Sequence, residues 1–262
     1  MELNLVGKNV LITGASKGIG LACAVGFAEE GCVVHLAARN SVELDKACNE
    51  ISKKYGVNAI AHVYDLSIDE NVQSLAKECG DIDILINNAG AIPGGNIFDV
   101  TDARWRKAWD LKVFGYINLT REVYASMKAK GKGVIVNIIG LAGERNRPDY
   151  IAGTTGNAGL MAFTRALGAE SVDFGIRVVG VNPGRVETDR QINHHKEDAA
   201  KEFGDTNRWE EIRARISNTL PFKRSGRADE VADLTVFLAS ERASYMSGTV
   251  VTIDAGQSLR AR

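Results

Sequence analysis

The chain has 262 residues, of which 45% are hydrophobic and 25% are charged, a composition typical of a water-soluble globular protein. Its formal net charge of −1 supplies no positive field for a nucleic-acid backbone, and no apolar run approaches the roughly 20 residues of a membrane span. Met1–Gly7 has no signal-peptide layout. We expect one domain, residues 1–262, in a cytoplasmic protein that binds neither nucleic acid nor membrane.

Short runs rich in β-branched residues alternate along the chain with amphipathic stretches of helical length, which predicts βαβ units. The expected strands are Asn9–Thr13, Val33–Ala37, Ala59–Val63, Ile84–Asn87, Gly133–Ile138, Arg177–Val181 and Thr249–Ile253. The expected helices include Gly18–Glu30, Val42–Tyr55 and Thr101–Lys130. Most strands are apolar throughout, as in sheets covered on both faces. We therefore expect an α/β fold of the Rossmann type, a doubly wound parallel sheet of about seven strands with helices on both faces.

One long polar and charged segment, residues 189–220, breaks this alternation, and a loop of that length is usually a lid with helices of its own. It contains His194 and His195, which we expect on a solvated helix face rather than in a metal site. The cysteines (Cys23, Cys32, Cys48 and Cys79) form no CxxC pair, and we expect no histidine ligands beside them. They predict structural thiols in a reducing compartment, with no metal site.

A glycine-rich loop follows the first expected strand and opens a helix. Its glycines allow a tight turn and close approach to a pyrophosphate, which the free N–H groups and dipole of the helix N-terminus stabilise. Because the loop lies between a strand and a helix, we expect these residues to bind a dinucleotide: Gly14, Ser16, Lys17, Gly18, Ile19 and Gly20.

The end of the second expected strand predicts which dinucleotide binds. Sheets that bind NAD place an acid there for the ribose hydroxyls, whereas a 2′-phosphate needs a cation. Here Ala38 stands at the acid's position, Arg39 follows it, and Lys17 offers a second positive charge. The planar guanidinium of arginine suits a phosphate, so NADP(H) is favoured over NAD(H).

Further segments occur in the order and at the spacing of the short-chain dehydrogenase/reductase family, which the chain resembles over nearly its whole length. The glycine-rich loop resembles the family's TGxxxGxG, and Asn87-Asn88-Ala89-Gly90 matches its NNAG. The resemblance assigns to cofactor binding Asp65, Leu66, Asn88, Ala89, Gly90, Pro183, Gly184, Val186 and Thr188, and Ser247-Gly248 through Asp254-Ala255-Gly256 is similar to the last strand. It further implies a small carbonyl or alcohol as substrate and a homo-oligomer, a tetramer or a dimer.

The same resemblance locates four catalytic positions, and other residues stand at each of them. Asn157 through Glu170 resembles the helix that follows the family's YxxxK, which puts Gly153 at the tyrosine and Asn157 at the lysine. Gly140 then falls at the serine and Lys112 at the asparagine. Lys112 and Asn157 thus look like an exchange of the family's lysine and asparagine between facing helices.

Three residues are candidates for the catalytic role: Lys112, Asn157 and Tyr150. Tyr150 precedes Gly153 by three residues, but its plainer interpretation is a loop tyrosine packed beside Pro148. Lys112 lies in a stripe of apolar residues at helical spacing, so it either faces the cleft or lies at a subunit interface.

Three hypotheses for the function follow. The first is an NADP(H)-dependent oxidoreductase with an atypical active site, which the intact cofactor motifs favour. The second is a non-catalytic NADP(H)-binding sensor or partner subunit, which the changed catalytic positions favour. The third is a lyase or hydratase on the same scaffold, with the crevice lined by Glu144, Arg145 and Arg147.

Overall fold

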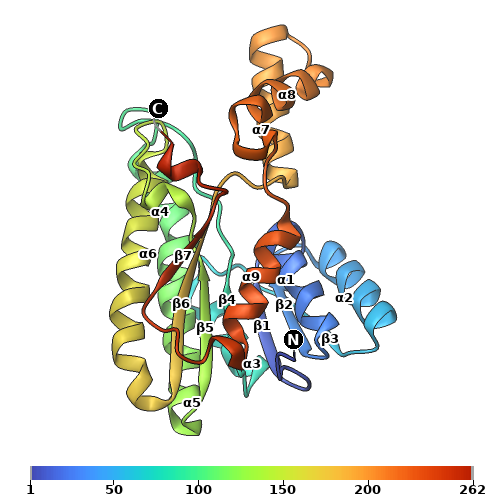
Figure 1. Ribbon diagram of the computed structural model, residues 1–262, viewed down its shortest axis with the longest axis vertical. Coiled ribbons are helices and arrows are strands. Elements are labelled where there is room, and N and C mark those ends of the chain that lie inside the picture. The colour runs from blue at the N-terminus through green and yellow to red at the C-terminus, as the bar shows by residue number, and fades with distance from the viewer. Residues whose placement is uncertain (1, 261–262) are drawn as a thin grey trace.

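The computed structural model describes residues 2–260, which fold around a parallel sheet of seven strands in the order β3-β2-β1-β4-β5-β6-β7 (Figure 1). The strands are β1 (Asn9–Thr13), β2 (Val33–Ala38), β3 (Ala59–Val63), β4 (Ile84–Asn87), β5 (Gly133–Ile138), β6 (Ile176–Pro183) and β7 (Val250–Ile253). The expected Rossmann-type sheet is confirmed, with each strand boundary within two residues of the expected one.

Helices cover both faces of the sheet because alternate strand residues point to opposite sides. Val10 and Ile12 pack toward α1 (Gly18–Glu29), α2 (Ser41–Tyr55) and α9 (Ala228–Ala239). Leu11, between them, packs on the other side, which α3 (Asp69–Cys79), α5 (Gly115–Lys130) and α6 (Ile151–Glu170) cover. The strand order reverses between β1 and β4, which places the ligand crevice outside the carboxyl ends of these strands.

The expected continuous helix Thr101–Lys130 is wrong in one respect. The structure has α4 (Asp102–Trp109), a π-helical turn over Asp110–Phe114, and then α5. Hydrophobic periodicity cannot reveal one widened turn inside a long helix. Single π-turns occur frequently at functional sites, and this one carries Lys112.

The polar segment forms α7 (Asp189–Phe203) and α8 (Trp209–Thr219), which contact each other and stand beyond the carboxyl end of the sheet in Figure 1. A β-bridge between Val186 and Gly226 joins the chain segment that leads into these two helices to the segment that follows them. The role of these helices as a lid stays a prediction. Within residues 2–260, no helix combines the length and apolar composition that crossing a membrane requires.

The expectation that both histidines of α7 are solvated is wrong for His195. That side chain is buried, whereas His194 is half exposed. Adjacent helical residues point in directions about 100° apart, so His195 falls on the inner face with the buried Ala199. Burial, together with the positive charge of Arg185, lowers the pKa of His195.

Candidate active site

A cavity of about 1340 Å³ opens at the carboxyl ends of the strands. Of the sixteen residues expected to bind the cofactor, all except Gly20 and Asp65 line it: Gly14, Ser16, Lys17, Gly18, Ile19, Arg39, Leu66, Asn88, Ala89, Gly90, Pro183, Gly184, Val186 and Thr188. The fold therefore brings the segments that were assigned to cofactor binding into one cavity.

The glycine-rich loop has the backbone that its sequence predicts. Gly14 and Gly18 adopt φ values of +64° and +59°, and a Cβ on Gly20 would lie 2.3 Å from the carbonyl oxygen of Gly14. Asn88 fixes the loop because its Nδ2 donates to the carbonyl oxygen of Thr13 at 2.9 Å. No side chain caps the N-terminus of α1, which begins at Gly18. Its N–H groups are available to an anion, so a pyrophosphate fits here.

The two cations expected to meet a 2′-phosphate are each close to a carboxylate. Lys17 Nζ lies 3.7 Å from Glu43, which also accepts a hydrogen bond from Ser16 Oγ at 3.1 Å. Arg39 lies 3.8 Å from Asp65. Asp65 does not line the cavity, but Glu43 does. A phosphate bound here would compete with Glu43 for Lys17.

Lys112 points into the cavity. Its Nζ donates to the carbonyl oxygen of Ile139 at 2.6 Å, and its stem passes so close to Gly90 that a Cβ there would lie 2.8 Å from Lys112 Cδ. Burial of the ammonium, together with the positive charge of Arg190, lowers the pKa of Lys112 to about 7. This side chain therefore changes its charge near neutral pH.

Asn157 and Lys112 both bind backbone carbonyls just beyond the end of β5. Asn157 Nδ2 donates to the carbonyl oxygen of Gly140 at 3.3 Å, one residue beyond the carbonyl that Lys112 binds. Its Oδ1 is buried and has no hydrogen-bond partner in the part of the chain that the structure describes. A buried acceptor without a partner is costly, so Oδ1 suits a donor on a bound molecule, such as a ribose hydroxyl.

Gly140 has a backbone conformation that favours glycine. Its φ is +124°, and a Cβ at this position would lie 3.1 Å from Asn157 Nδ2. A serine side chain would be strained here. The position therefore offers no side-chain hydroxyl, and its backbone carbonyl accepts from Asn157 Nδ2.

Tyr150 ends the loop before α6, which agrees with the loop position that the plainer interpretation predicted. It is the N-cap residue of α6, and it lines the cavity. A Cβ on Gly153 would lie 1.9 Å from Tyr150 Cε1 and 2.2 Å from Cζ, so the phenol ring fills the space where a side chain at position 153 would begin. The helix turn that starts at Tyr150 folds its ring back onto the residue three positions later.

Arg190 is a cavity residue that the sequence analysis missed. It lies in the first turn of α7, donates to the carbonyl oxygen of Ile92 at 2.5 Å, and lies close enough to the Tyr150 hydroxyl to oppose the rise of its pKa. Burial raises the pKa of Tyr150, while the charges of Arg190 and Arg147 oppose that rise. Forty residues separate Arg190 from Tyr150 in the chain, and no motif joins them.

The close contact between Tyr150 and Gly153 predicts a position-specific effect on stability. We expect Gly153→Ala to lower the free energy of unfolding by about 1–3 kcal/mol because its methyl group overlaps the ring. In a Tyr150→Ala background the same change should instead be neutral or stabilising. Chemical denaturation of the two single variants and the double variant measures this coupling.

Gly159→Ala is the matched control, since Gly159 lies on the same helix with no atom within 4 Å of its added Cβ. That change should raise the free energy of unfolding by about 0.5–1 kcal/mol. Equal effects of Gly153→Ala in the two backgrounds would show that the ring does not occupy this space.

The sequence model of the family described as short chain dehydrogenase matches residues 8–199. The chain belongs to the short-chain dehydrogenase family. Family membership identifies it with a class of oxidoreductases that bind small-molecule substrates, and it accounts for the cavity at the carboxyl ends of the strands.

Relatives of this short-chain dehydrogenase match along its whole length. An uncharacterized oxidoreductase of Thermotoga maritima is 34% identical over 258 residues, covering 97% of this chain and 98% of the relative. A 3-oxoacyl-(acyl-carrier-protein) reductase of Aquifex aeolicus is 30% identical, with 98% and 99% covered. The crystal structure of L-sorbose reductase from Gluconobacter frateurii, complexed with NADPH and L-sorbose, superimposes with a TM-score of 0.93 at 32% identity and full coverage of both chains.

Proposed function

We propose that this protein is an NADP(H)-dependent oxidoreductase that reduces a small polar carbonyl compound, and that Tyr150 donates the proton. The observation that carries the proposal is the position of the Tyr150 ring, which faces the cavity and fills the side-chain space of Gly153. The phenol of Tyr150 thus occupies nearly the space that a tyrosine at position 153 would occupy, although the chain has glycine there.

The residues of the chain suit the cofactor. The N–H groups at the start of α1 would hold the pyrophosphate, and Asn157 Oδ1 would accept from a hydroxyl of the nicotinamide ribose. When bound, NADPH supplies a hydride. As the carbonyl carbon of the substrate gains the hydride, the π-electron pair of its C=O bond moves onto oxygen, so the reduction needs a group that protonates this oxygen.

Tyr150 and Lys112 divide this task in our proposal. Tyr150 donates its hydroxyl proton to the carbonyl oxygen, and Arg190 orients that hydroxyl and stabilises the phenolate that remains. Lys112, fixed by its hydrogen bond to Ile139, supplies a positive charge that stabilises the developing alkoxide. Proton donation and charge stabilisation then come from different elements, α6 and the π-turn.

The far end of the cavity favours a polar substrate. Its wall includes the cationic or amide side chains of Arg145, Arg147, Arg185, Gln191 and Asn193. These side chains offer many hydrogen-bond donors, which suits a hydroxylated carbonyl compound. The printed ligand of the L-sorbose reductase structure is a compound of this class.

The direct test is an assay of NADPH oxidation with L-sorbose and a panel of small hydroxylated ketones and aldehydes. Oxidation that depends on the added carbonyl supports the proposal. If NADPH binds but no compound is turned over, the non-catalytic sensor or partner subunit is favoured. Conversion of a compound without consumption of NADPH would favour the lyase or hydratase.

Arg39 should determine the choice of cofactor. We expect NADPH to bind more tightly than NADH, because Arg39 and Lys17 line the cavity, where they would meet the 2′-phosphate, and Ala38 offers no acid to the ribose. Arg39→Asp should reverse the preference, and Glu43→Gln should strengthen NADPH binding by freeing Lys17. Fluorescence titration with both cofactors measures these affinities.

Lys53→Asp is the control, since it makes the same charge change at an exposed position of α2 that does not line the cavity. It should leave the ratio of the two affinities unchanged. Equal affinities of the unaltered protein for NADPH and NADH would contradict the cofactor assignment.

A further inference from the structure

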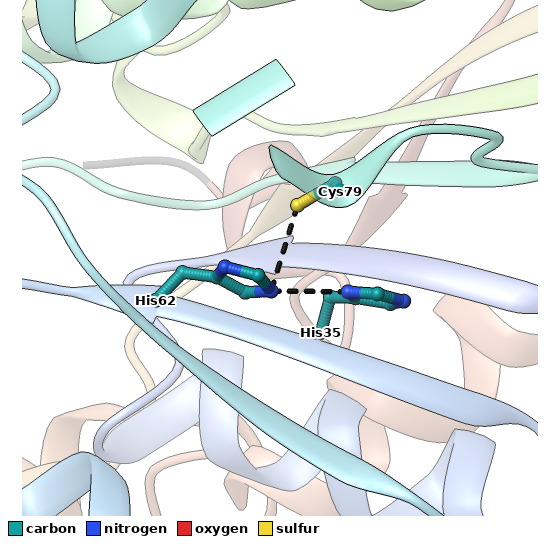
Figure 2. A group of neighbouring side chains, drawn as sticks. All are labelled: His35, His62 and Cys79. Atoms are coloured by element: carbon teal, nitrogen blue, oxygen red, sulfur yellow. Dashed lines mark hydrogen bonds between the residues drawn. The ribbon is translucent and has the colours of Figure 1, made fainter. Parts of the chain in front are cut away.

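Three buried side chains meet beneath the edge of the sheet, away from the cofactor cavity (Figure 2). They are His35 of β2, His62 of β3 and Cys79 at the end of α3. His62 Nε2 lies 3.0 Å from His35 Nδ1 and 3.6 Å from Cys79 Sγ, and all three potential ligand atoms are within 4.8 Å of one another. None of the three residues lines the cavity. The expectation that no cysteine has neighbouring histidines is therefore wrong for Cys79.

The fold explains how residues so far apart in the sequence come together. In the parallel pair of β2 and β3, Ala37 is opposite His62, and His35 is two residues before Ala37. His35 and His62 therefore lie diagonally on the same face of the sheet. Helix α3 packs on that face and ends at Cys79, which directs its thiol toward the two rings (Figure 2).

A second, independent observation concerns the other nitrogen of His62. Its Nδ1 lies 2.8 Å from a carboxylate oxygen of Glu78, and the second oxygen of Glu78 accepts a hydrogen bond from the Tyr64 hydroxyl at 2.7 Å. A carboxylate on the far nitrogen fixes the tautomer, so that Nε2 presents its lone pair to the cluster. Metal-binding histidines nearly always have such a partner.

We propose that His35 Nδ1, His62 Nε2 and Cys79 Sγ form a binding site for Zn²⁺. Tetrahedral zinc, with Zn–S near 2.3 Å and Zn–N near 2.05 Å, separates a sulfur from a nitrogen by about 3.6 Å and two nitrogens by about 3.3 Å. The observed separations at His62 are 3.6 Å to sulfur and 3.0 Å to nitrogen. To hold the ion the two imidazoles have to part by a few tenths of an ångström, and the third pair of ligand atoms, Cys79 Sγ and His35 Nδ1, lies within 4.8 Å.

The ligand set selects zinc among the common cations. Two imidazoles and a thiolate suit a borderline-soft metal, whereas Mg²⁺ and Ca²⁺ prefer oxygen ligands. On binding, the Cys79 thiol releases its proton to solvent. The negative charges of the Cys79 thiolate and the Glu78 carboxylate then balance the two positive charges of the ion.

A metal ion at this site would stabilise the edge of the sheet. β3 is the outermost strand beside β2, and Cys79 ends the helix that covers this face. An ion bound by all three would cross-link the edge strand, its neighbour and α3. Glu78 has a half-exposed side chain, so the cluster lies one residue beneath the surface.

Metal titration of the full-length protein tests the proposal. Zn²⁺ competition against a chromophoric chelator, with elemental analysis of the dialysed protein, should give one equivalent bound. Co²⁺ should produce a thiolate-to-metal charge-transfer band in the near ultraviolet. We expect Cys79→Ser to abolish the band and to weaken Zn²⁺ binding at least 100-fold, and Glu78→Gln to weaken binding about 10- to 100-fold.

Cys48→Ser is the matched control, because Cys48 is a free cysteine as buried as Cys79, with 7% and 8% exposed. It should leave the Co²⁺ band and the Zn²⁺ affinity unchanged. The absence of a thiolate band in the unaltered protein overturns the proposal without reference to any variant. It is equally overturned if folded Cys79→Ser and His62→Gln, verified by circular dichroism, still bind Zn²⁺ with the original affinity.

Discussion

Replacement of Tyr150 by phenylalanine is expected to lower kcat for NADPH-dependent carbonyl reduction by about 10²–10⁴-fold, the usual loss when a general acid is removed. The ring, and with it the packing against Gly153, stays in place. Only the hydroxyl that Arg190 contacts is lost. NADPH affinity should therefore be unchanged, and steady-state assays with the best substrate of the panel, together with fluorescence titration, measure both quantities.

Tyr124→Phe provides the comparison, since it removes a phenol hydroxyl from α5 at a half-buried position outside the cavity. Its kcat should equal that of the unaltered protein. If Tyr150→Phe also retains full activity, the proton comes from another group and Tyr150 has only a packing role.

The charge of Lys112 should control the pH dependence of the reaction. With its pKa lowered to about 7, Lys112 is positively charged below pH 7 and neutral above it. We expect kcat/KM to be highest below pH 7 and to fall as the pH rises through 7. A rate limited by Tyr150 alone would fall only above pH 10, because the pKa of that phenol is raised. Lys112→Met should remove the limb near pH 7 and lower kcat by about 10²–10³-fold.

Unfolding measurements on the same variant need no substrate. Below pH 7 Lys112 is charged in both folded and unfolded chains, so the folded protein bears the whole cost of burying the ammonium. Between pH 7 and 10.5 the unfolded chain binds more protons than the folded one, and this cost disappears as the pH rises. We therefore compare the free energy of unfolding of Lys112→Met with that of the unaltered protein. The difference, variant minus unaltered protein, should be larger at pH 6 than at pH 10. A difference independent of pH would indicate a solvated Lys112.

The fold could be predicted from the sequence because its signals are local. Apolar runs separated by helical stretches gave all seven strands, and the glycines of the cofactor loop stand where positive φ or close contact requires them. The π-turn at Asp110–Phe114 was missed because it widens a single turn without altering the hydrophobic stripe. The homo-oligomer, the cytoplasmic location and the lid role of α7 and α8 stay predictions.

The candidate site was only partly predictable, because its geometry depends on contacts between distant segments. Counting along the chain located Gly153 and Asn157, but only the folded chain shows the Tyr150 ring above Gly153. Arg190 and the Cys79 cluster were missed for the same reason, since each partner lies on a different element. Sequence spacing reports neighbours within one element and gives no distance across the sheet.

The ring of Tyr150 has a consequence for protein engineering. A tyrosine introduced at position 153 to copy the family's arrangement would meet an occupied space, and a serine at Gly140 would meet a φ of +124°. Libraries that vary one position at a time would discard both substitutions as unstable before any gain in rate appeared. A successful graft has to remove the ring at position 150 in the same step as it adds one at 153, so these two codons belong in one combinatorial cassette.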